Sequence, residues 1–277
     1  LSKTLMHWIN DGLMVIFFLL VGLEIKREFV VGELSSLKKA MLPIIAAVGG
    51  MIGPALIFLA FNAGHPLNAR GWGIPMATDI AFALGILSLA GRSVPTSLKV
   101  FLAALAIIDD LGAILVIALF YTEQLSFFYL FAALCIFLIL FMAGKKGFAV
   151  LPVYLLAGMV MWYCMFRSGV HATISGVLLA FAIPFGGTGK ESPSYRLQHV
   201  LHNPVAFGIV PLFALANTGI TLQPAFYNSL LSLNSLGIVG GLFLGKPIGV
   251  LGFCWFAVKS GLASLPAQVN WKQLLGA

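Results

Sequence analysis

The sequence reads Ala106-Ile107-Ile108-Asp109-Asp110-Leu111-Gly112 near the middle of an apolar run that extends roughly from Ser97 to Phe120. An ionised carboxylate at the centre of a membrane-spanning helix costs about 2.5–3.5 kcal/mol on insertion scales. Charged side chains inside a membrane usually face a cavity or a partner and mark an ion or proton path. The two adjacent aspartates therefore predict a functional site within a membrane-spanning segment.

The composition of the 277-residue chain is typical of an integral membrane protein. Hydrophobic residues make up 60% and charged residues only 9%, whereas a soluble domain carries roughly 25% charged residues. The net charge of +7 could suggest a nucleic-acid partner, but the basic residues are scattered between apolar runs and form no continuous basic face. We therefore expect membrane lipid around the chain and no nucleic-acid partner.

Hydropathy predicts an all-α, polytopic helical bundle that takes in the whole chain, residues 1–277. Most connections are short, but a polar surface loop is predicted at 186–202. Lys and Arg concentrate at one set of loop ends, while Lys3, Arg70 and Arg167 lie at the other, so the first set is predicted to be cytoplasmic. The spans, about nine in all, are predicted near residues 5–23, 40–61, 71–90, 97–120, 125–143, 148–166, 169–185, 203–220 and 234–258.

The span near residues 71–90 carries helix breakers and a third acid. Pro75 weakens a helix before it, and Thr78 or Asp79 is a natural N-cap for a new helix that begins at Ile80. The pattern favours two half-helices joined by extended peptide, and broken helices at mid-depth line cavities and hold ions. The alternative is a kinked but continuous helix in which Thr78 bonds to its own backbone.

Lys246 lies in the middle of the last predicted span, directly before Pro247. Gly241, Gly245 and Gly249 repeat every four residues around it and give a thin face that lets another helix approach closely. A lysine at this depth does not easily reach the membrane surface by snorkelling. We therefore predict that Lys246 meets a carboxylate from a neighbouring helix.

Four charged residues fall at similar depths on three spans, namely Asp79, Asp109, Asp110 and Lys246. Neighbouring helix positions point about 100° apart, so one of Asp109 and Asp110 is expected to face a cavity while the other meets a partner such as Lys246. Carboxylates and the Thr78 hydroxyl are hard oxygen ligands that suit Na+ or Li+. Competition between a proton and a cation for this site, with access from alternate sides, would produce antiport.

Five stretches, in order along nearly the whole chain, resemble bacterial sodium/proton antiporters of the NhaA type. The resemblance implies an inverted-repeat transporter in the bacterial inner membrane, with two broken helices that cross at the midplane. It implies that Asp109 and Asp110 bind Na+ and exchange cytoplasmic Na+ or Li+ for external protons, which would control internal pH and sodium. It also implies that Lys246 pairs with an aspartate and that Asp79 and Thr78 lie at the crossing. The stretches are FLLVGLEIKRE (18–28), ATDIAFALG (77–85), AIIDDLGAI (106–114), SGVHAT (168–173) and GKP (245–247).

Compared with this family, the chain is expected to lack the first helix and the last two, including the second broken helix. The inverted-repeat architecture would then be incomplete, and we expect residues 1–277 alone not to transport. A homodimer would depend on segments absent from the chain, largely a hairpin before Leu1.

The resemblance also implies a charged cluster that responds to pH, in which Gln198 stands where an acid is usual. Judged without the resemblance, His199 and His202 are a solvated pair in a loop, and His171 is a structural histidine of an apolar span. Judged in the same way, the solvated end of a helix is formed by Glu24, Lys26, Arg27 and Glu28. The candidates for a pH response are Glu24, Arg27, Glu28, His171, His199 and His202.

Two other classes of function compete with the transporter. An intramembrane aspartyl protease could use Asp79 and Asp110 as a dyad that shares one proton, but neither acid follows Gly-x-Gly and a nearby lysine would disturb the sharing. A passive cation channel would explain a broken helix but not a lysine at mid-depth. We therefore expect a transporter and not an enzyme, with Na+, Li+ and H+ as transported ions and no cofactor.

Overall fold

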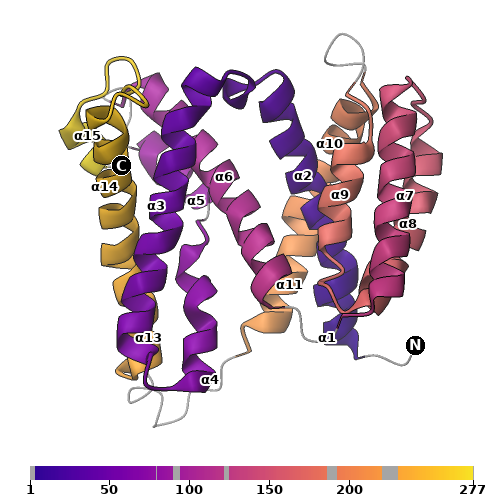
Figure 1. Cartoon of the computed structure of the whole chain (residues 1–277), viewed down its shortest axis with the longest axis horizontal. Coiled ribbons are helices and arrows are strands. Elements are labelled where there is room, and N and C mark those ends of the chain that lie inside the picture. The colour runs from indigo at the N-terminus through magenta and orange to yellow at the C-terminus, as the bar shows by residue number, and fades with distance from the viewer. Residues whose placement is uncertain are drawn as a thin grey trace. The chain divides into compact units, whose positions relative to one another are not determined.

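The computed structural model describes residues 4–78, 80–89, 94–121, 125–185, 192–219 and 230–276. All the regular elements within these ranges are helices (Figure 1). Some of them join into longer runs, and seven continuous helical runs in the described ranges are long and apolar enough to cross a membrane. The chain is therefore an all-α, polytopic membrane protein. Its helices form two compact units, unit 1 (Leu1–Val30 and Ile117–Thr221) and unit 2 (Val31–Val116 and Leu222–Ala277).

Unit 1 begins with a continuous helical stretch from Leu5 to Val30 and is held together by buried apolar side chains. Tyr154 and Met161 lie fully buried in its core, and the Tyr154 hydroxyl donates a hydrogen bond of 2.8 Å to the carbonyl oxygen of Phe148. The elements of unit 1 are α1 (Leu5–Trp8), η1 (Ile9–Leu13), α2 (Met14–Val30), α7 (Phe127–Lys145), α8 (Leu151–Ser168), α9 (Ile174–Ala182), α10 (Pro193–Pro204), η6 (Val205–Ile209) and α11 (Val210–Asn217).

Unit 2 contains the two aspartates and the lysine that the sequence singled out. Helix α6, which carries both aspartates, runs from Thr96 to Phe120, and its last residues belong to unit 1. The other elements are η2 (Glu33–Ser35), α3 (Leu37–Asn62), α4 (Pro66–Ala69), η3 (Arg70–Met76), α5 (Ile80–Leu89), α13 (Leu233–Gly240), η7 (Gly241–Gly245), α14 (Lys246–Lys259) and α15 (Trp271–Leu275).

Helices α3 and α14 lie side by side in unit 2 (Figure 1) because glycines bring their backbones together. A Cβ atom at Gly249 would overlap the carbonyl oxygen of Gly49, and one at Gly245 would lie 2.7 Å from the backbone nitrogen and Cα of Pro54. Real Cβ atoms essentially never approach other heavy atoms so closely. The thin glycine face predicted around Lys246 is therefore confirmed.

The span predicted near residues 71–90 is broken. Helix η3 ends at Met76, Ala77 is extended (φ −66°, ψ 147°), Thr78 is not helical, and α5 begins at Ile80. The kinked continuous helix is therefore not what forms. Asp79, at the junction, lies outside the described residues.

The surface loop predicted at 186–202 is wrong for its second half, because α10 begins at Pro193 and carries both His199 and His202. The Ser192 side chain accepts a hydrogen bond of 3.1 Å from the backbone N–H of Tyr195, and a proline is well tolerated in the first turn that follows. The polar composition of this segment therefore marks a capped helix with a polar face.

The span predicted at 169–185 is helical only from Ile174 to Ala182. Gly169 adopts a left-handed conformation (φ 86°) that ends α8, and the next residues form a turn that leads into α9. His171 is exposed in this connection, so its expected place inside an apolar span is wrong. Whether residues 71–90 and 169–185 cross the membrane stays a prediction.

The contact between α3 and α14 predicts a large effect of one methyl group. Gly249→Ala should lower the free energy of unfolding by about 1–3 kcal/mol, because its Cβ would lie 2.8 Å from the carbonyl carbon of Gly49. Thermal unfolding in detergent measures this change. The matched control is Gly252→Ala on the same helix, whose Cβ has no other atom within 4 Å. Equal stability of the two variants would contradict the packing described here.

Candidate ion-binding site

Helices α6 and α14 bring Asp109 and Lys246 together inside unit 2. The Lys246 Nζ atom lies 2.8 Å from Oδ2 of Asp109, with 0% of the aspartate side chain and 14% of the lysine side chain exposed. An isolated charge buried to this extent is costly, so each group depends on the other. The sequence left open which aspartate meets Lys246, and the structure shows that it is Asp109.

The broken span supplies two further polar contacts to this pair. The Thr78 hydroxyl donates a hydrogen bond of 2.7 Å to Oδ2 of Asp109, and Lys246 Nζ donates to the carbonyl oxygen of Met76. A carbonyl at the end of a helix has no partner within that helix and is free to accept this bond. Asp109, Lys246 and Thr78 therefore meet as the sequence predicted.

One oxygen of Asp109 has no partner among the described residues. Thr78 and Lys246 both contact Oδ2, whereas Oδ1 is buried and receives no hydrogen bond. Buried carboxylate oxygens are normally satisfied. Oδ1 is therefore a strong acceptor that is available to a cation, a proton or a water molecule.

Asp110, the next residue on α6, is less buried than Asp109, and it has an interaction of its own. The unequal burial agrees with the different directions expected of neighbouring helix positions. No group of three or more His, Cys, Asp and Glu side chains in the described ranges could hold a metal ion. A Na+ site on Asp109 and Asp110 would therefore need hydroxyl or backbone oxygens as well.

Unit 1 gathers most of the residues proposed to respond to pH. Glu24 on α2 is hydrogen-bonded to the side chain of Gln198 on α10 and lies close enough to Arg27 and His202 for electrostatic interaction. The Arg27 guanidinium lies 3.3 Å from the carboxylate of Glu28. Gln198 thus contacts this cluster through Glu24. His199, in contrast, is exposed on α10.

His171 is separate from this cluster. It precedes the first turn of α9, whereas α2 contacts the last residues of that helix through Lys26. His171 instead lines a polar pocket of about 830 Å³ together with His7, Asp11 and Arg167. The structure therefore places the six candidates in two different regions of unit 1.

Lys26, which the sequence analysis assigned to a solvated helix end, is instead partly buried against the end of α9. Its Nζ atom donates to the carbonyl oxygens of Phe181 at 2.8 Å and Ala180 at 3.4 Å, and also to that of Ile183. The last carbonyls of a helix lack partners and attract cations. Pro184, directly after α9, was the signal in the sequence that carbonyls are left free there.

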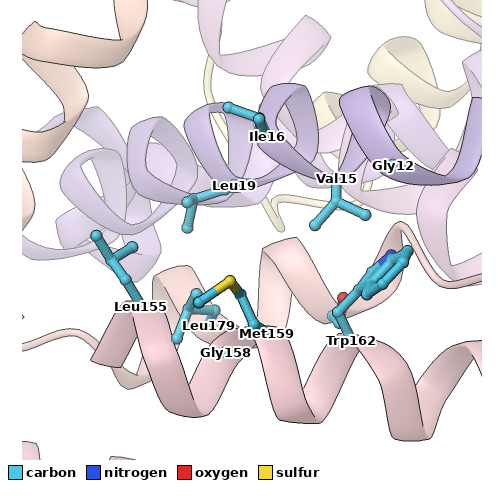
Figure 2. Close-up of a pocket in the computed structure, with 10 residues that line it drawn as sticks. Gly12, Val15, Ile16, Leu19, Leu155, Gly158, Met159, Trp162 and Leu179 are labelled. Carbon is cyan, nitrogen blue, oxygen red and sulfur yellow. The ribbon is translucent and has the colours of Figure 1, made fainter. Parts of the chain in front are cut away.

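A second pocket in unit 1 is a poor site for an ion. It has a volume of about 500 Å³ and lies between α2 and α8, lined mainly by apolar side chains such as Leu19 and Leu155 (Figure 2). The polar groups of its lining are already engaged. Trp162 Nε1 donates to the Asp11 carbonyl at 2.8 Å, and the Ser175 hydroxyl donates to that of Ala172 at 2.6 Å. This pocket therefore offers, among the described residues that line it, no free side-chain ligand for a cation.

Comparison with known proteins shows the family of the chain over its whole length. Residues 1–277 match the family model described as Na+/H+ antiporter 1. The chain is 57% identical to the Na(+)/H(+) antiporter NhaA of Cytophaga hutchinsonii, over 99% of the chain and 71% of the relative. It is 56% identical to the Na(+)/H(+) antiporter NhaA 1 of Flavobacterium johnsoniae, over 100% of the chain and 72% of the relative. Identity to the Na(+)/H(+) antiporter NhaA of Vibrio cholerae is 54%, over 97% of the chain and 70% of the relative.

The buried ion pair predicts that removal of its cation is costly. Lys246→Met should lower the free energy of unfolding by about 3–5 kcal/mol, because the Asp109 carboxylate would remain buried without a counter-charge. The double variant Asp109→Asn with Lys246→Met should recover part of this loss, since both charges are then removed. Thermal unfolding of the purified protein at neutral pH measures both effects.

The exposed Lys272 offers a control, because Lys272→Met removes a lysine charge without leaving a buried partner. A Lys246→Met protein as stable as this control would show that the pair does not compensate a buried charge.

Proposed function

We propose that this chain, which belongs to the Na+/H+ antiporter 1 family, exchanges cytoplasmic Na+ or Li+ for external protons at the site around Asp109 and Asp110. The observation that carries the assignment to this site is the buried Asp109–Lys246 pair with a second acid beside it. We place the protein in the bacterial inner membrane, where this exchange would control internal pH and sodium.

The chemistry of the site couples the two ions. A cation bound at Oδ1 of Asp109 faces the same carboxylate as the Lys246 ammonium and weakens their ion pair by competition. A proton on either aspartate removes a negative charge and lowers the affinity of the site for Na+. Occupancy by Na+ and occupancy by protons therefore exclude one another, which is the requirement for exchange.

Access from alternate sides would use the break between η3 and α5. The link at Ala77 and Thr78 is not helical, so its backbone dihedrals can change without breaking helical hydrogen bonds. Because Thr78 binds Asp109 and Met76 binds Lys246, movement of either half-helix would change the contacts of the pair. Asp79, at the same junction, is proposed to be a further ligand or counter-charge of the site.

The charged cluster of unit 1 is proposed to set the pH range of exchange. It combines the carboxylates of Glu24 and Glu28 with the imidazole of His202. Gln198, which is hydrogen-bonded to Glu24, cannot titrate, so the pH threshold should differ from that of a protein with an acid there.

The paired lysine distinguishes antiport from the two competing functions. A lysine 2.8 Å from Asp109 places a positive charge beside the residue next to Asp110, and a charge there would disturb the sharing of one proton by the candidate dyad of Asp79 and Asp110. A passive channel also gives no reason to bury a lysine at a carboxylate. The relatives are named antiporters, and we propose the same function here.

Removal of either carboxylate predicts loss of exchange. In inside-out vesicles that contain the full-length protein and an acid interior, added Na+ should relieve the quenching of a pH-sensitive dye. Asp109→Asn and Asp110→Asn should each abolish this response, because the amide can neither bind a proton in its place nor carry the negative charge that attracts Na+. Asp11→Asn, which changes an acid of unit 1 paired with His7 at 3.2 Å, should keep it. Normal exchange by Asp110→Asn would contradict the site.

The cluster in unit 1 predicts a separate effect on pH dependence. The double variant Glu24→Gln with His202→Gln removes a carboxylate and an imidazole that lie close to one another, so the rate of exchange should rise less steeply with pH while the maximal rate is kept. Rates measured from pH 6 to 9, in steps of about half a unit, test this. A profile as steep as that of the unmodified protein would exclude the cluster from pH control.

A further inference from the structure

The unpartnered oxygen of Asp109 faces a place where α3 has no side chain. A Cβ atom at Gly50 would lie 3.6 Å from Oδ1 of Asp109 and 3.9 Å from Cε of Lys246. Gly50 is therefore a residue of α3 that faces the ion pair. Any side chain larger than hydrogen at this position would lie against the one oxygen of Asp109 that has no donor.

The space at Gly50 differs from the close contacts elsewhere along α3. A Cβ at Gly49 or Gly53 would overlap a backbone carbonyl of the neighbouring helix, so these glycines are needed for the approach of α14. A Cβ at Gly50 would instead meet side-chain atoms, and the closest of them is Cγ2 of Val250 at 3.1 Å. An alanine could therefore be fitted at position 50 with a small shift of Val250, and packing of the two backbones does not by itself require glycine here.

We propose that Gly50 is a specificity-determining residue, because it keeps open the face of Asp109 Oδ1 that the transported cation occupies and so sets how large a cation the site accepts. This inference rests on the proposed exchange at Asp109 and Asp110. Ions of one charge differ in size, and the larger Na+ needs more room beside the same oxygen than Li+. A methyl group at position 50 would reduce this room and disfavour Na+ more than Li+.

The test is Gly50→Ala in the full-length protein, with exchange measured in inside-out vesicles over a range of Na+ and Li+ concentrations. The apparent KM for Na+ should rise about tenfold, the scale on which one methyl group affects discrimination in a fitted site. The apparent KM for Li+ should rise less, so the ratio of the two KM values changes. A general loss of stability would alter the amount of active protein and the maximal rate, and would leave this ratio unchanged.

Two further variants separate an effect of the methyl group on the Asp109 carboxylate from an effect on helix packing. Gly240→Ala is the matched control in unit 2, because its Cβ would make ordinary contacts with Ile57 at 3.4 Å and Phe61 at 3.7 Å, and its KM ratio should stay that of the unmodified protein. Gly50→Ala with Val250→Ala relieves the tight contact with Val250 and keeps the methyl at Oδ1, so the changed ratio should persist.

The outcomes distinguish a failure of the role of Gly50 from a failure of the proposed exchange function. Exchange by the unmodified protein together with an unchanged Na+/Li+ ratio in Gly50→Ala would overturn the role of Gly50 alone. A ratio that returns to normal in the double variant would assign the effect to Val250 packing and would also overturn it. No Na+-driven proton movement by the unmodified protein would contradict the proposed function, and the inference with it.

Discussion

The buried ion pair between Asp109 and Lys246 is the constraint on which unit 2 depends. Neither charge could lie at this depth alone, because the cost of an unpaired buried ion exceeds what local packing returns. The pair requires α6, α14 and the end of η3 to stay together, since Thr78 and the Met76 carbonyl complete its contacts. A cation that competed for Asp109 would therefore disturb three elements together, and this would link the proposed ion binding to a change of conformation.

Glycine packing makes this arrangement possible. The backbones of α3 and α14 touch at Gly49, Gly53 and Gly249, and small residues at helix interfaces are a common means of close packing inside a membrane. This contact fixes the position of Lys246 at the start of α14. The neighbouring Gly50 then leaves Oδ1 of Asp109 uncovered, so one run of glycines in α3 serves packing at some positions and ion access at another.

Much of the fold and the centre of the site could be predicted from the sequence. Apolar runs predicted the membrane helices, breakers around Pro75 predicted the broken span, and deep charges predicted the pairing of Lys246 with an aspartate. The sequence could not choose between Asp109 and Asp110, because this choice depends on how α6 is rotated against α14. It also missed the second half of the 186–202 segment, where Ser192 and Pro193 start a helix in a stretch too polar to be recognised by hydropathy. Contacts to backbone carbonyls, such as those of Lys26, leave no pattern of side chains in the sequence.

The central claim is that Na+ and protons compete for the carboxylates of Asp109 and Asp110, and calorimetry tests it most directly. Na+ is titrated into the purified full-length protein in buffers of equal pH that differ in their heats of ionisation, which reveals the number of protons released per bound Na+. The account predicts proton release by the unmodified protein and its loss, together with Na+ binding, in the Asp109→Asn and Asp110→Asn proteins. Na+ binding without any release of protons, or with equal release in these variants, would contradict it.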